Sequence, residues 1–336
     1  MPCMVTVGGF FGDEGKGKIV SYLANKDNLH IAVRGGVGPN AGHTFTHEGK
    51  TYKVRMLPSA VLNKFTKLMI GAGVLVDPHI LLNEIESFDS ADRTFIDFQC
   101  GIIEKSHIKK DSAEMHLKSE IGTTGTGTGP ANADRSYRIL KLAKDIPILH
   151  NYTENVSNLV NSALDSNQHV LVEGTQGTFL SLYHGNYPYV TSKDVTASAI
   201  CSDVGIGPKR ISDVIIVFKA YVTRVGKGPL QHEIDDKETE KRGWLEYGSV
   251  TGRKRRVSPF NLDLAKKAVR LNSATQIALT KLDVLFPSSA GIKDFSKLPC
   301  ESKKFIEDIE AETGLKITLI GTGAEIDEII DLRMNQ

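Results

Sequence analysis

The residues best suited to chemistry lie in a glycine-rich loop that follows the first apolar run. Residues 8–19 read GGFFGDEGKGKI, and Gly12 to Lys18 fits the glycine, four residues, glycine, lysine part of a P-loop, whose bare amides and helix N-terminus hold phosphate. Ile19 stands where a P-loop supplies Ser or Thr to magnesium. A carboxylate among phosphates would repel them unless it handles a cation or a proton, so Asp13 is the candidate for that work. The alternative is a glycine-rich turn with solvated charges.

A second glycine loop carries a histidine. Residues 34–44 read RGGVGPNAGHT and follow the next predicted strand, so they can bring His43 beside the phosphate loop. A histidine next to phosphate can donate a proton or neutralise charge on a transferring phosphoryl group. A loop histidine is more often structural, and that alternative stays open.

Two further loops offer hydrogen-bond donors and acceptors. Residues 121–130 alternate glycine with threonine and predict another anion clamp. Residues 173–178, EGTQGT, follow an apolar strand and place Gln176 where its amide suits a purine or amide edge.

Cationic residues and a short base-reading pattern come later. Residues 251–256, TGRKRR, pack four cations together, so we expect bound anions to offset their repulsion, although such a run is often a solvated surface or a nuclear-targeting peptide. Lys281-Leu282-Asp283 ends a strand, and a carboxylate in a Lys-x-Asp pattern accepts two hydrogen bonds that guanine offers and adenine does not. Combined with the phosphate loop and residues 320–323, IGTG, it favours guanine.

Composition excludes several classes of protein. The 336 residues carry 41 Lys plus Arg against 40 Asp plus Glu, so no global field recruits nucleic acid or an acidic membrane, and anion binding must be local. The four cysteines are scattered, which favours a reducing cytosol, and neither a signal peptide nor a long apolar run is evident. We therefore expect a cytoplasmic protein that is not embedded in a membrane.

Short apolar runs alternate with helical patterns along the chain, which predicts an α/β fold with a mostly parallel central sheet flanked by helices. Loops at the carboxyl ends of such strands form the ligand crevice. No linker divides the chain, so residues 1–336 are predicted to form one domain. The predicted strands are 4–7, 30–33, 67–70, 169–172, 276–279 and 316–320; the predicted helices are 19–24, 80–85, 137–143, 156–164, 262–271 and 305–309. The mixed charges of residues 233–242 predict a solvated loop or helix start.

In this order, the motifs resemble the adenylosuccinate synthetase family, the GTP-dependent ligases of purine synthesis. The resemblance spans Gly8 to about Glu328 and is closest to the compact, archaeal variety. It implies a single catalytic domain and a reaction in two steps. GTP phosphorylates the 6-oxygen of inosine monophosphate (IMP), and the amino group of L-aspartate then displaces that phosphate to give adenylosuccinate.

The resemblance also implies the roles of individual residues. Asp13 would be the base and a magnesium ligand, His43 the acid, and the Gly42 carbonyl a second metal ligand. The GTP site would comprise Gly12, Asp13, Glu14, Gly15, Lys16, Gly17, Lys18, Gly42, His43, Thr44, Arg255, Lys281, Leu282, Asp283, Gly321, Thr322 and Gly323. The IMP site would comprise Asp13, Glu14, Gly15, Lys16, Asn40, Ala41, Gly42, His43, Thr124, Arg138, Gln176, Thr191 and Arg253. The aspartate site would comprise Ser249, Val250, Thr251, Gly252, Arg253, Lys254 and Arg255.

The same resemblance implies one Mg²⁺ per subunit and a homodimer in which Arg138 reaches the neighbouring site. Two alternatives compete with this resemblance. A GTP-binding switch module without ligase activity leaves His43, Gln176 and the arginine run without a role. A nucleic-acid binder built on residues 253–256 lacks both a basic surface and a stacking platform, since the chain has a single Trp, Trp244.

Overall fold

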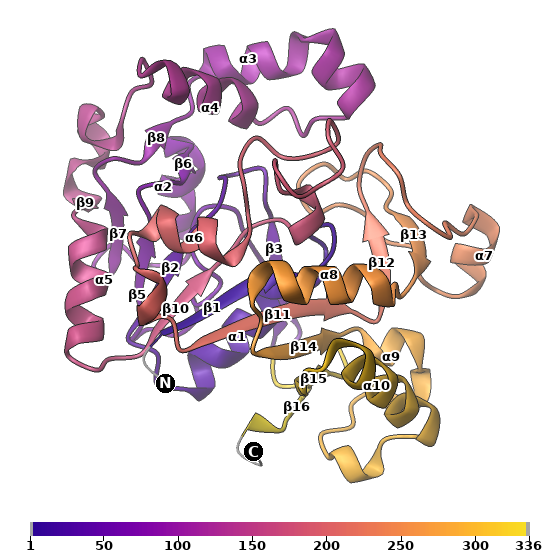
Figure 1. Ribbon diagram of the computed structural model, residues 1–336. Helices are drawn as coiled ribbons and strands as arrows, with labels where there is room; N and C mark the ends of the chain where they lie inside the picture. The colour runs from indigo at the N-terminus through magenta and orange to yellow at the C-terminus, as the bar shows by residue number, and fades with distance from the viewer. Residues whose placement is uncertain (1–2, 334–336) are drawn as a thin grey trace.

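The computed structural model describes residues 3–333, and a ten-stranded sheet runs through its centre (Figure 1). The strand order is β16-β15-β14-β11-β1-β10-β2-β5-β7-β9. Every neighbouring pair in this sheet is parallel except β15 and β16. The prediction of an α/β fold with a mostly parallel sheet is therefore confirmed.

The sheet strands are β1 (Cys3–Gly8), β2 (Ile31–Arg34), β5 (Lys67–Ile70), β7 (Thr94–Asp97), β9 (Thr153–Glu154), β10 (Val170–Glu173), β11 (Asp213–Lys219), β14 (Gln276–Thr280), β15 (Ile317–Gly321) and β16 (Ile329–Asp331). Three two-stranded sheets pair β3 (His43–His47) with β4 (Lys50–Val54), β6 (Leu75–Val76) with β8 (Gly101–Ile102), and β12 (Tyr221–Arg224) with β13 (Arg256–Pro259). The α-helices are α1 (Lys16–Lys26), α2 (Pro78–Ser87), α3 (Lys105–Ala113), α4 (Thr128–Tyr137), α5 (Val156–Asp165), α6 (Ala197–Val204), α7 (Asp236–Lys241), α8 (Leu262–Asn272), α9 (Leu282–Leu285) and α10 (Cys300–Thr313).

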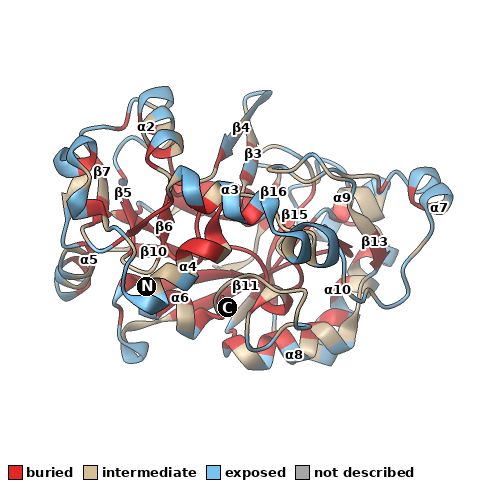
Figure 2. Ribbon diagram, turned by 90° about the horizontal axis from the view of Figure 1, so that it is seen from above, coloured by how far each residue is buried: buried red, intermediate tan, exposed pale blue. Residues whose placement is uncertain are grey.

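Both faces of the sheet are covered. Side chains alternate between faces along β11, so Ile216 and Phe218 join one apolar cluster while Ile215 and Val217 join another. The first cluster includes residues of α5, α6, α8 and α10, and the second includes residues of α1 and α2. Figure 2 shows the result, with buried strands inside and exposed helix faces outside. A strand buried on both faces reads as a continuous apolar run, which is what β1, β10 and β11 do.

The six strands predicted from the sequence all exist within about a residue of their predicted ends. Five of the six predicted helices lie inside α1, α2, α5, α8 and α10, of which α1, α2 and α10 extend beyond the predicted ends. The helix predicted over residues 137–143 is wrong. The helical stretch there is α4, which begins in the threonine loop and ends at Tyr137, because Arg138 takes the left-handed conformation with φ 64°. The central strand β11 was not predicted, although its sequence, DVIIVFK, is as apolar as that of its neighbours. Residues 233–242 contain the exposed helix α7, as expected.

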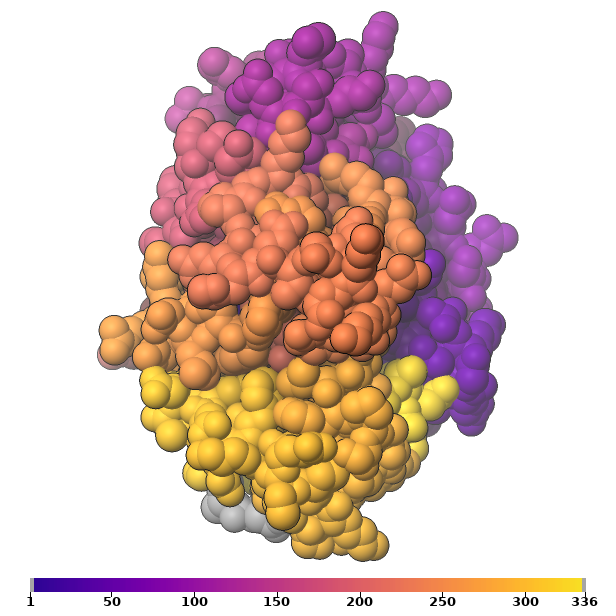
Figure 3. Space-filling view, turned by 90° about the vertical axis from the view of Figure 1, so that its right-hand side faces the viewer, coloured from indigo at the N-terminus to yellow at the C-terminus, as the bar shows by residue number. Residues whose placement is uncertain are grey.

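An arm joins β12 to β13 and carries α7. Figure 3 shows this segment in orange, between the magenta and purple part of the chain and the yellow C-terminal part. Trp244 attaches the arm to the body, since its ring stacks on Tyr221 with centroids 4.7 Å apart. Among the described helices, none is long and apolar enough to cross a membrane.

The strand that precedes the phosphate loop packs closely on its neighbour at Gly9. A Cβ on Gly9 would lie 2.1 Å from Cε1 of Phe218, in the ring that packs on Phe10 and Phe260. We therefore expect Gly9→Ala to lower the free energy of unfolding by about 1–3 kcal/mol, the usual cost of overpacking a core, as measured by urea unfolding.

Gly207→Ala is the matched control, because a Cβ there meets nothing within 4 Å. Adding Phe218→Leu to Gly9→Ala should recover part of the loss. Equal urea midpoints for the two single variants would refute this account of the close approach.

Candidate functional site

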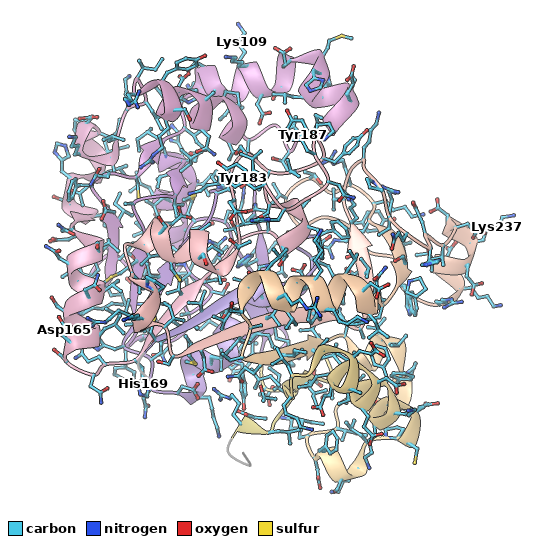
Figure 4. The ribbon with its side chains drawn as sticks, viewed as in Figure 1. Lys109, Asp165, His169, Tyr183, Tyr187 and Lys237 are labelled. Atoms are coloured by element: carbon cyan, nitrogen blue, oxygen red, sulfur yellow. The ribbon has the colours of Figure 1, made fainter. Side chains whose placement is uncertain are left out.

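A cavity of about 360 Å³ lies at the carboxyl ends of β1, β2 and β10. Four segments contribute to the wall of this cavity: the phosphate loop (residues 8–19), the histidine loop (34–44), the threonine loop (121–130) and the hairpin that carries the arginine run (251–256). Predicted site residues that line it are Gly12, Asp13, Asn40, Ala41, Gly42, His43, Thr124, Gln176, Thr191, Ser249, Val250, Thr251 and Arg253. Tyr187, which Figure 4 labels below α3, also lines this cavity.

Two charged side chains of the phosphate loop, Glu14 and Lys16, bond to each other and to the backbone rather than facing a ligand. Glu14 Oε1 accepts hydrogen bonds from the amides of Phe10 and Gly12, at 2.9 and 2.8 Å. Lys16 Nζ donates to Glu14 Oε2 at 2.9 Å and to the Gln176 carbonyl at 2.5 Å. Both side chains are fully buried, so only the backbone of these two residues is left to meet a ligand. The ion pair fixes the loop and ties it to the Gln176 loop.

The side chain of Lys18 points away from the phosphate loop, toward the segment that follows β15. Its Nζ donates to the carbonyls of Gly323 at 2.6 Å and Glu328 at 2.9 Å. Burial lowers the pKa of Lys18 to about 8, against the attraction of Asp283 and Glu328. Lys18 thus connects the phosphate loop to the glycine segment that follows β15.

Asp13 is held by a cation. Its Oδ1 lies 2.8 Å from Nη2 of Arg255, and its Oδ2 accepts from the Thr223 hydroxyl at 3.4 Å. Burial raises the pKa of the Asp13 carboxyl, while Arg255 and Lys219 oppose that rise. Arg255 also pairs with Glu246, so one guanidinium joins two carboxylates.

His43 is held by a carboxylate and lies beside an arginine. Glu173 Oε1 bonds to His43 Nδ1, and Arg34 Nη1 lies 2.7 Å from that nitrogen and 3.2 Å from Glu173. Arginine is always a donor, so a proton on Nδ1 is directed to Glu173, and Arg34 acts as the counter-charge of that carboxylate. Ser59 donates to Glu173 through its amide and its hydroxyl, both at 2.6 Å.

This arrangement leaves His43 neutral with one nitrogen toward the cavity. Burial and the nearby Arg34 lower the pKa of His43 to about 4. Although burial alone would raise it, the pKa of Glu173 is held at about 2 by His43 and Arg34. His43 Nε2 is buried and has no hydrogen-bond partner in the described part of the chain.

Two amide side chains in the cavity also have unused acceptors. Asn40 Nδ2 donates to the Thr191 hydroxyl at 3.3 Å, but Asn40 Oδ1 has no partner within residues 3–333. Gln176 Oε1 is likewise buried and unpaired there. Buried polar atoms are nearly always hydrogen-bonded, so these oxygens indicate a polar ligand.

The arginine run is arranged differently from the sequence-based expectation. The four cations do not need bound anions to offset their repulsion, because the protein supplies carboxylates to three of them. Arg255 pairs with Asp13 and Glu246, Lys254 with Asp236 at 2.7 Å, and Arg256 with Glu233. Only Arg253 has no carboxylate partner among the described residues; its Nη1 donates to the Gly122 carbonyl at 2.9 Å. Lys254 is exposed toward α7, away from the cavity, so an aspartate-binding role for its ammonium is not supported.

The predicted guanine-reading residues form a second group, outside the cavity. Thr280, just before Lys281, donates to the Glu14 carbonyl at 2.7 Å and so joins this group to the phosphate loop. Asp283 Oδ1 is buried and unpaired in the described chain, whereas Leu282 is a core side chain that can offer a ligand only its backbone. Arg138 is exposed and lines neither group.

Sequence reasoning missed several residues that position the site. The sequence motifs give no role to Glu173, Arg34, Ser59, Lys219 or Glu246. A lysine at the end of the apolar strand β11 was the available signal, because a buried lysine needs a partner. Asp111 was also missed; it accepts from Thr123 Oγ1 at 2.8 Å and the Gly127 amide at 2.7 Å, and so shapes the threonine loop.

The candidate metal ligands, the Asp13 carboxylate and the Gly42 carbonyl, suit a hard cation that is held by few protein groups. Within residues 3–333, no cluster of three or more His, Cys, Asp or Glu residues forms a metal cage. Asp13 and Gly42 both line the cavity, and the Gly42 carbonyl accepts from Ser249 Oγ at 3.0 Å. One carboxylate and one carbonyl fit Mg²⁺, which keeps several waters and takes its other ligands from phosphates.

Comparisons with known proteins agree on one family. The family model for adenylosuccinate synthetase matches residues 5–146 and 139–289. The adenylosuccinate synthetase of Methanocaldococcus jannaschii is 54% identical over 99% of this chain and 97% of its own. That of Archaeoglobus fulgidus is 52% identical, with 99% of each chain covered. The solved structure of fully ligated adenylosuccinate synthetase from Plasmodium falciparum superposes with a TM-score of 0.91 at 27% identity, covering 98% of this chain and 99% of that one.

The buried histidine predicts how stability depends on pH. The folded-state pKa of His43, about 4, lies below its ordinary value of 6.5, so the unfolded chain takes up this proton first. The contribution of neutral His43 to the free energy of unfolding is complete above about pH 6.5 and is lost as the pH falls toward 4. Between pH 7 and 4.5 we expect the wild type to lose roughly 2–3 kcal/mol more unfolding free energy than His43→Gln does.

Urea unfolding of both proteins at the two pH values measures this difference. Titrating groups that do not contact His43 are common to the pair, so their effects on the unfolding free energy largely cancel. Parallel losses in the two proteins would mean that His43 is not neutral in the folded state.

Proposed function

The chain belongs to the adenylosuccinate synthetase family, and from that premise we propose which of its residues carry out the family's reaction. The activity itself is that of an adenylosuccinate synthase, an IMP:L-aspartate ligase, since full-length relatives are more than 50% identical. A GTP-binding switch without ligase activity is thereby excluded. GTP phosphorylates the 6-oxygen of IMP, and the amino group of aspartate then displaces the phosphate.

One observation carries the assignment of roles: a carboxylate inside the phosphate loop and a neutral, oriented histidine line the same cavity. Asp13 takes the ring proton of the hypoxanthine base, because it is the only loop carboxylate not used within the loop. His43 faces the 6-oxygen with Nε2. An arriving phosphoryl anion favours the protonated imidazole, so His43 can hold a proton at Nε2 and stabilise the developing charge.

Magnesium belongs to this proposal. Asp13 and the Gly42 carbonyl would hold one ion per subunit, and such an ion would supply positive charge beside the transferred phosphoryl group. The missing hydroxyl at Ile19 supports the assignment, since a carboxylate inside the loop replaces it.

The remaining residues bind the substrates. The unpaired Oε1 of Gln176 and Oδ1 of Asn40 accept hydrogen bonds from IMP, with Gln176 at the hypoxanthine edge. Thr124, Thr191 and Arg253 lie around the same cavity and supply donors to the nucleotide. Ser249–Arg255 forms the aspartate loop, although Lys254 contributes backbone only. Asp283 reads guanine through its unpaired Oδ1, and the loop amides of residues 12–18 with Gly321–Gly323 hold the rest of GTP. A cytoplasmic location is supported by the free thiols of Cys3, Cys100, Cys201 and Cys300.

The dimer is also part of the proposal. Arg138 is exposed between Tyr137 and Ile139, which are 77% and 70% exposed. An exposed arginine flanked by aromatic and aliphatic side chains is typical of an interface rather than of a free surface. We infer that Arg138 reaches the IMP phosphate of the neighbouring subunit.

The proposed roles predict the outcome of an omission assay. Adenylosuccinate should form only when GTP, IMP, aspartate and Mg²⁺ are all present. The ultraviolet absorbance of the product measures its formation. Asp13→Asn should lower kcat at least about a hundredfold, the usual contribution of a general base. Asp89→Asn is the control, because Asp89 is fully exposed and its positive φ tolerates asparagine. Near-normal turnover by Asp13→Asn would refute the mechanism.

Sharing of Arg138 predicts complementation between two inactive variants. In a mixed dimer of Arg138→Leu and Asp13→Asn, one site receives both intact residues and the other receives neither. Half of randomly paired dimers are mixed, so mixing should restore about a quarter of wild-type activity. If Arg138 serves its own subunit, mixing restores nothing even when subunit exchange is demonstrated with differently tagged chains.

A further inference from the structure

We propose that Glu246 is a positioning residue for aspartate binding: it holds the Arg255 guanidinium in place for the substrate carboxylate. The inference rests on the proposed function of the Ser249–Arg255 loop. It adds a residue to which neither the sequence motifs nor the comparisons gave a role.

Glu246 sits at the centre of a buried polar network. Its Oε2 lies 3.0 Å from Lys219 Nζ and also pairs with Nη1 of Arg255. Its Oε1 accepts the hydroxyl of Tyr221. Lys219 and Arg255 hold the pKa of Glu246 at about 2, although burial alone would raise it. Glu246 is therefore ionised, and three side chains fix its carboxylate.

The anchors of Glu246 are themselves rigid. Lys219 ends the central strand β11 with 2% of its side chain exposed, and its Nζ also donates to Thr223 Oγ1 at 2.6 Å. Tyr221 begins β12, and its ring is fully buried and stacked on Trp244 with an interplanar angle of 10°. Glu246 thus fastens the arm to the end of the main sheet at a fixed point.

The same residue stands at the base of the aspartate loop. The Arg255 amide donates to the Glu246 carbonyl at 2.9 Å, and the Gly248 amide donates to the Arg253 carbonyl at 2.8 Å. Residues 249–252 are therefore the tip of a hairpin in which Glu246 faces Arg255 and Tyr247 faces Lys254. Removal of the Glu246 carboxylate leaves these backbone bonds intact and releases the guanidinium, together with the Lys219 ammonium and the Tyr221 hydroxyl, which lie outside the hairpin.

The distribution of charge explains why the guanidinium needs this second partner. Arg255 uses Nη2 for Asp13 and Nη1 for Glu246, and its Nε is buried without a partner in the described chain. When Asp13 turns to a metal ion or the substrate base, Glu246 is the carboxylate that Arg255 retains. A guanidinium held on one side presents its remaining donors in a fixed geometry, which lowers the entropic cost of binding a carboxylate.

Steady-state kinetics of Glu246→Gln test the proposal. The substitution keeps the shape of the side chain and removes its charge. We expect KM for aspartate to rise at least about tenfold, roughly the loss of one hydrogen bond between charged groups, while KM for IMP stays within about threefold. KM for GTP should rise less than KM for aspartate, because Arg255 also belongs to the predicted GTP site. Glu233→Gln is the matched control, because Glu233 holds Arg256 of the same run at the surface and should leave all three constants unchanged. Equal rises in all three constants, or none, would overturn the proposal.

A double-mutant comparison separates positioning from general damage. If Glu246 acts through Arg255, Glu246→Gln should change aspartate affinity by less than about twofold in an Arg255→Met background. Affinity in this background is read from the aspartate concentration that half-protects the protein against thermal unfolding with IMP and GDP present. The same tenfold loss in both backgrounds would show that Glu246 does not act through Arg255.

Folding and the proposed function are controlled separately. If Glu246→Gln fails to fold, Glu246→Asp takes its place; it keeps the charge one methylene shorter and should raise chiefly the aspartate KM, by a smaller factor. A uniform loss in Glu246→Asp would again overturn the proposal. Wild type that forms no adenylosuccinate refutes the proposed function instead, and that measurement precedes the variants.

Discussion

The site depends on one constraint: charges taken out of water must be paired inside the protein. Each of the two proposed catalytic residues is held in a similar way, by an arginine and a glutamate that are fully buried beside His43 and largely buried beside Asp13. Asp13 bonds to Arg255, which Glu246 holds, and His43 bonds to Glu173, which Arg34 accompanies. An unpaired ion in such surroundings costs several kcal/mol, so the pairs fix both geometry and protonation state. The side chains of Asp13 and His43 have fixed positions because their charged partners are themselves held by further ion pairs.

The sheet supplies the positions of these pairs. Glu173 ends β10, Arg34 ends the neighbouring β2, and Lys219 ends β11 on the other side of β1. Parallel strands bring these ends to one edge, and the glycine loops let the backbones meet there. A Cβ on Gly36 would lie 2.0 Å from Thr175 Oγ1, and a Cβ on Gly177 would lie 2.5 Å from the Gly12 amide. Larger residues at these points would separate the loops that form the cavity.

Sequence patterns predicted the glycine loops and their grouping because local rules govern them. In each unit the strand, the glycine turn and the start of the helix lie within about fifteen residues of sequence. The parallel sheet then brings the carboxyl ends of these strands to one edge. The partners were not predictable in this way. Glu246 and Lys219 are 27 residues apart and Glu173 and His43 are 130 apart, so only the folded chain brings them together. The helix predicted over residues 137–143 failed for a local reason instead, since the left-handed conformation of Arg138 ends α4 there without a glycine.

The near-zero net charge acquires a physical meaning from these contacts. Without substrates, most cations of the site already have partners within the chain: Lys16 has Glu14, Lys18 has two carbonyls, and Arg255 has two carboxylates. Under the proposed function, substrate binding is an exchange of partners rather than the filling of a positive pocket. Lys18 and Arg253 give up only neutral carbonyls, so an anion recruits them at low cost. Arg255 gives up a carboxylate only if Asp13 gains another positive partner, which makes occupation of the aspartate subsite depend on a cation at Asp13.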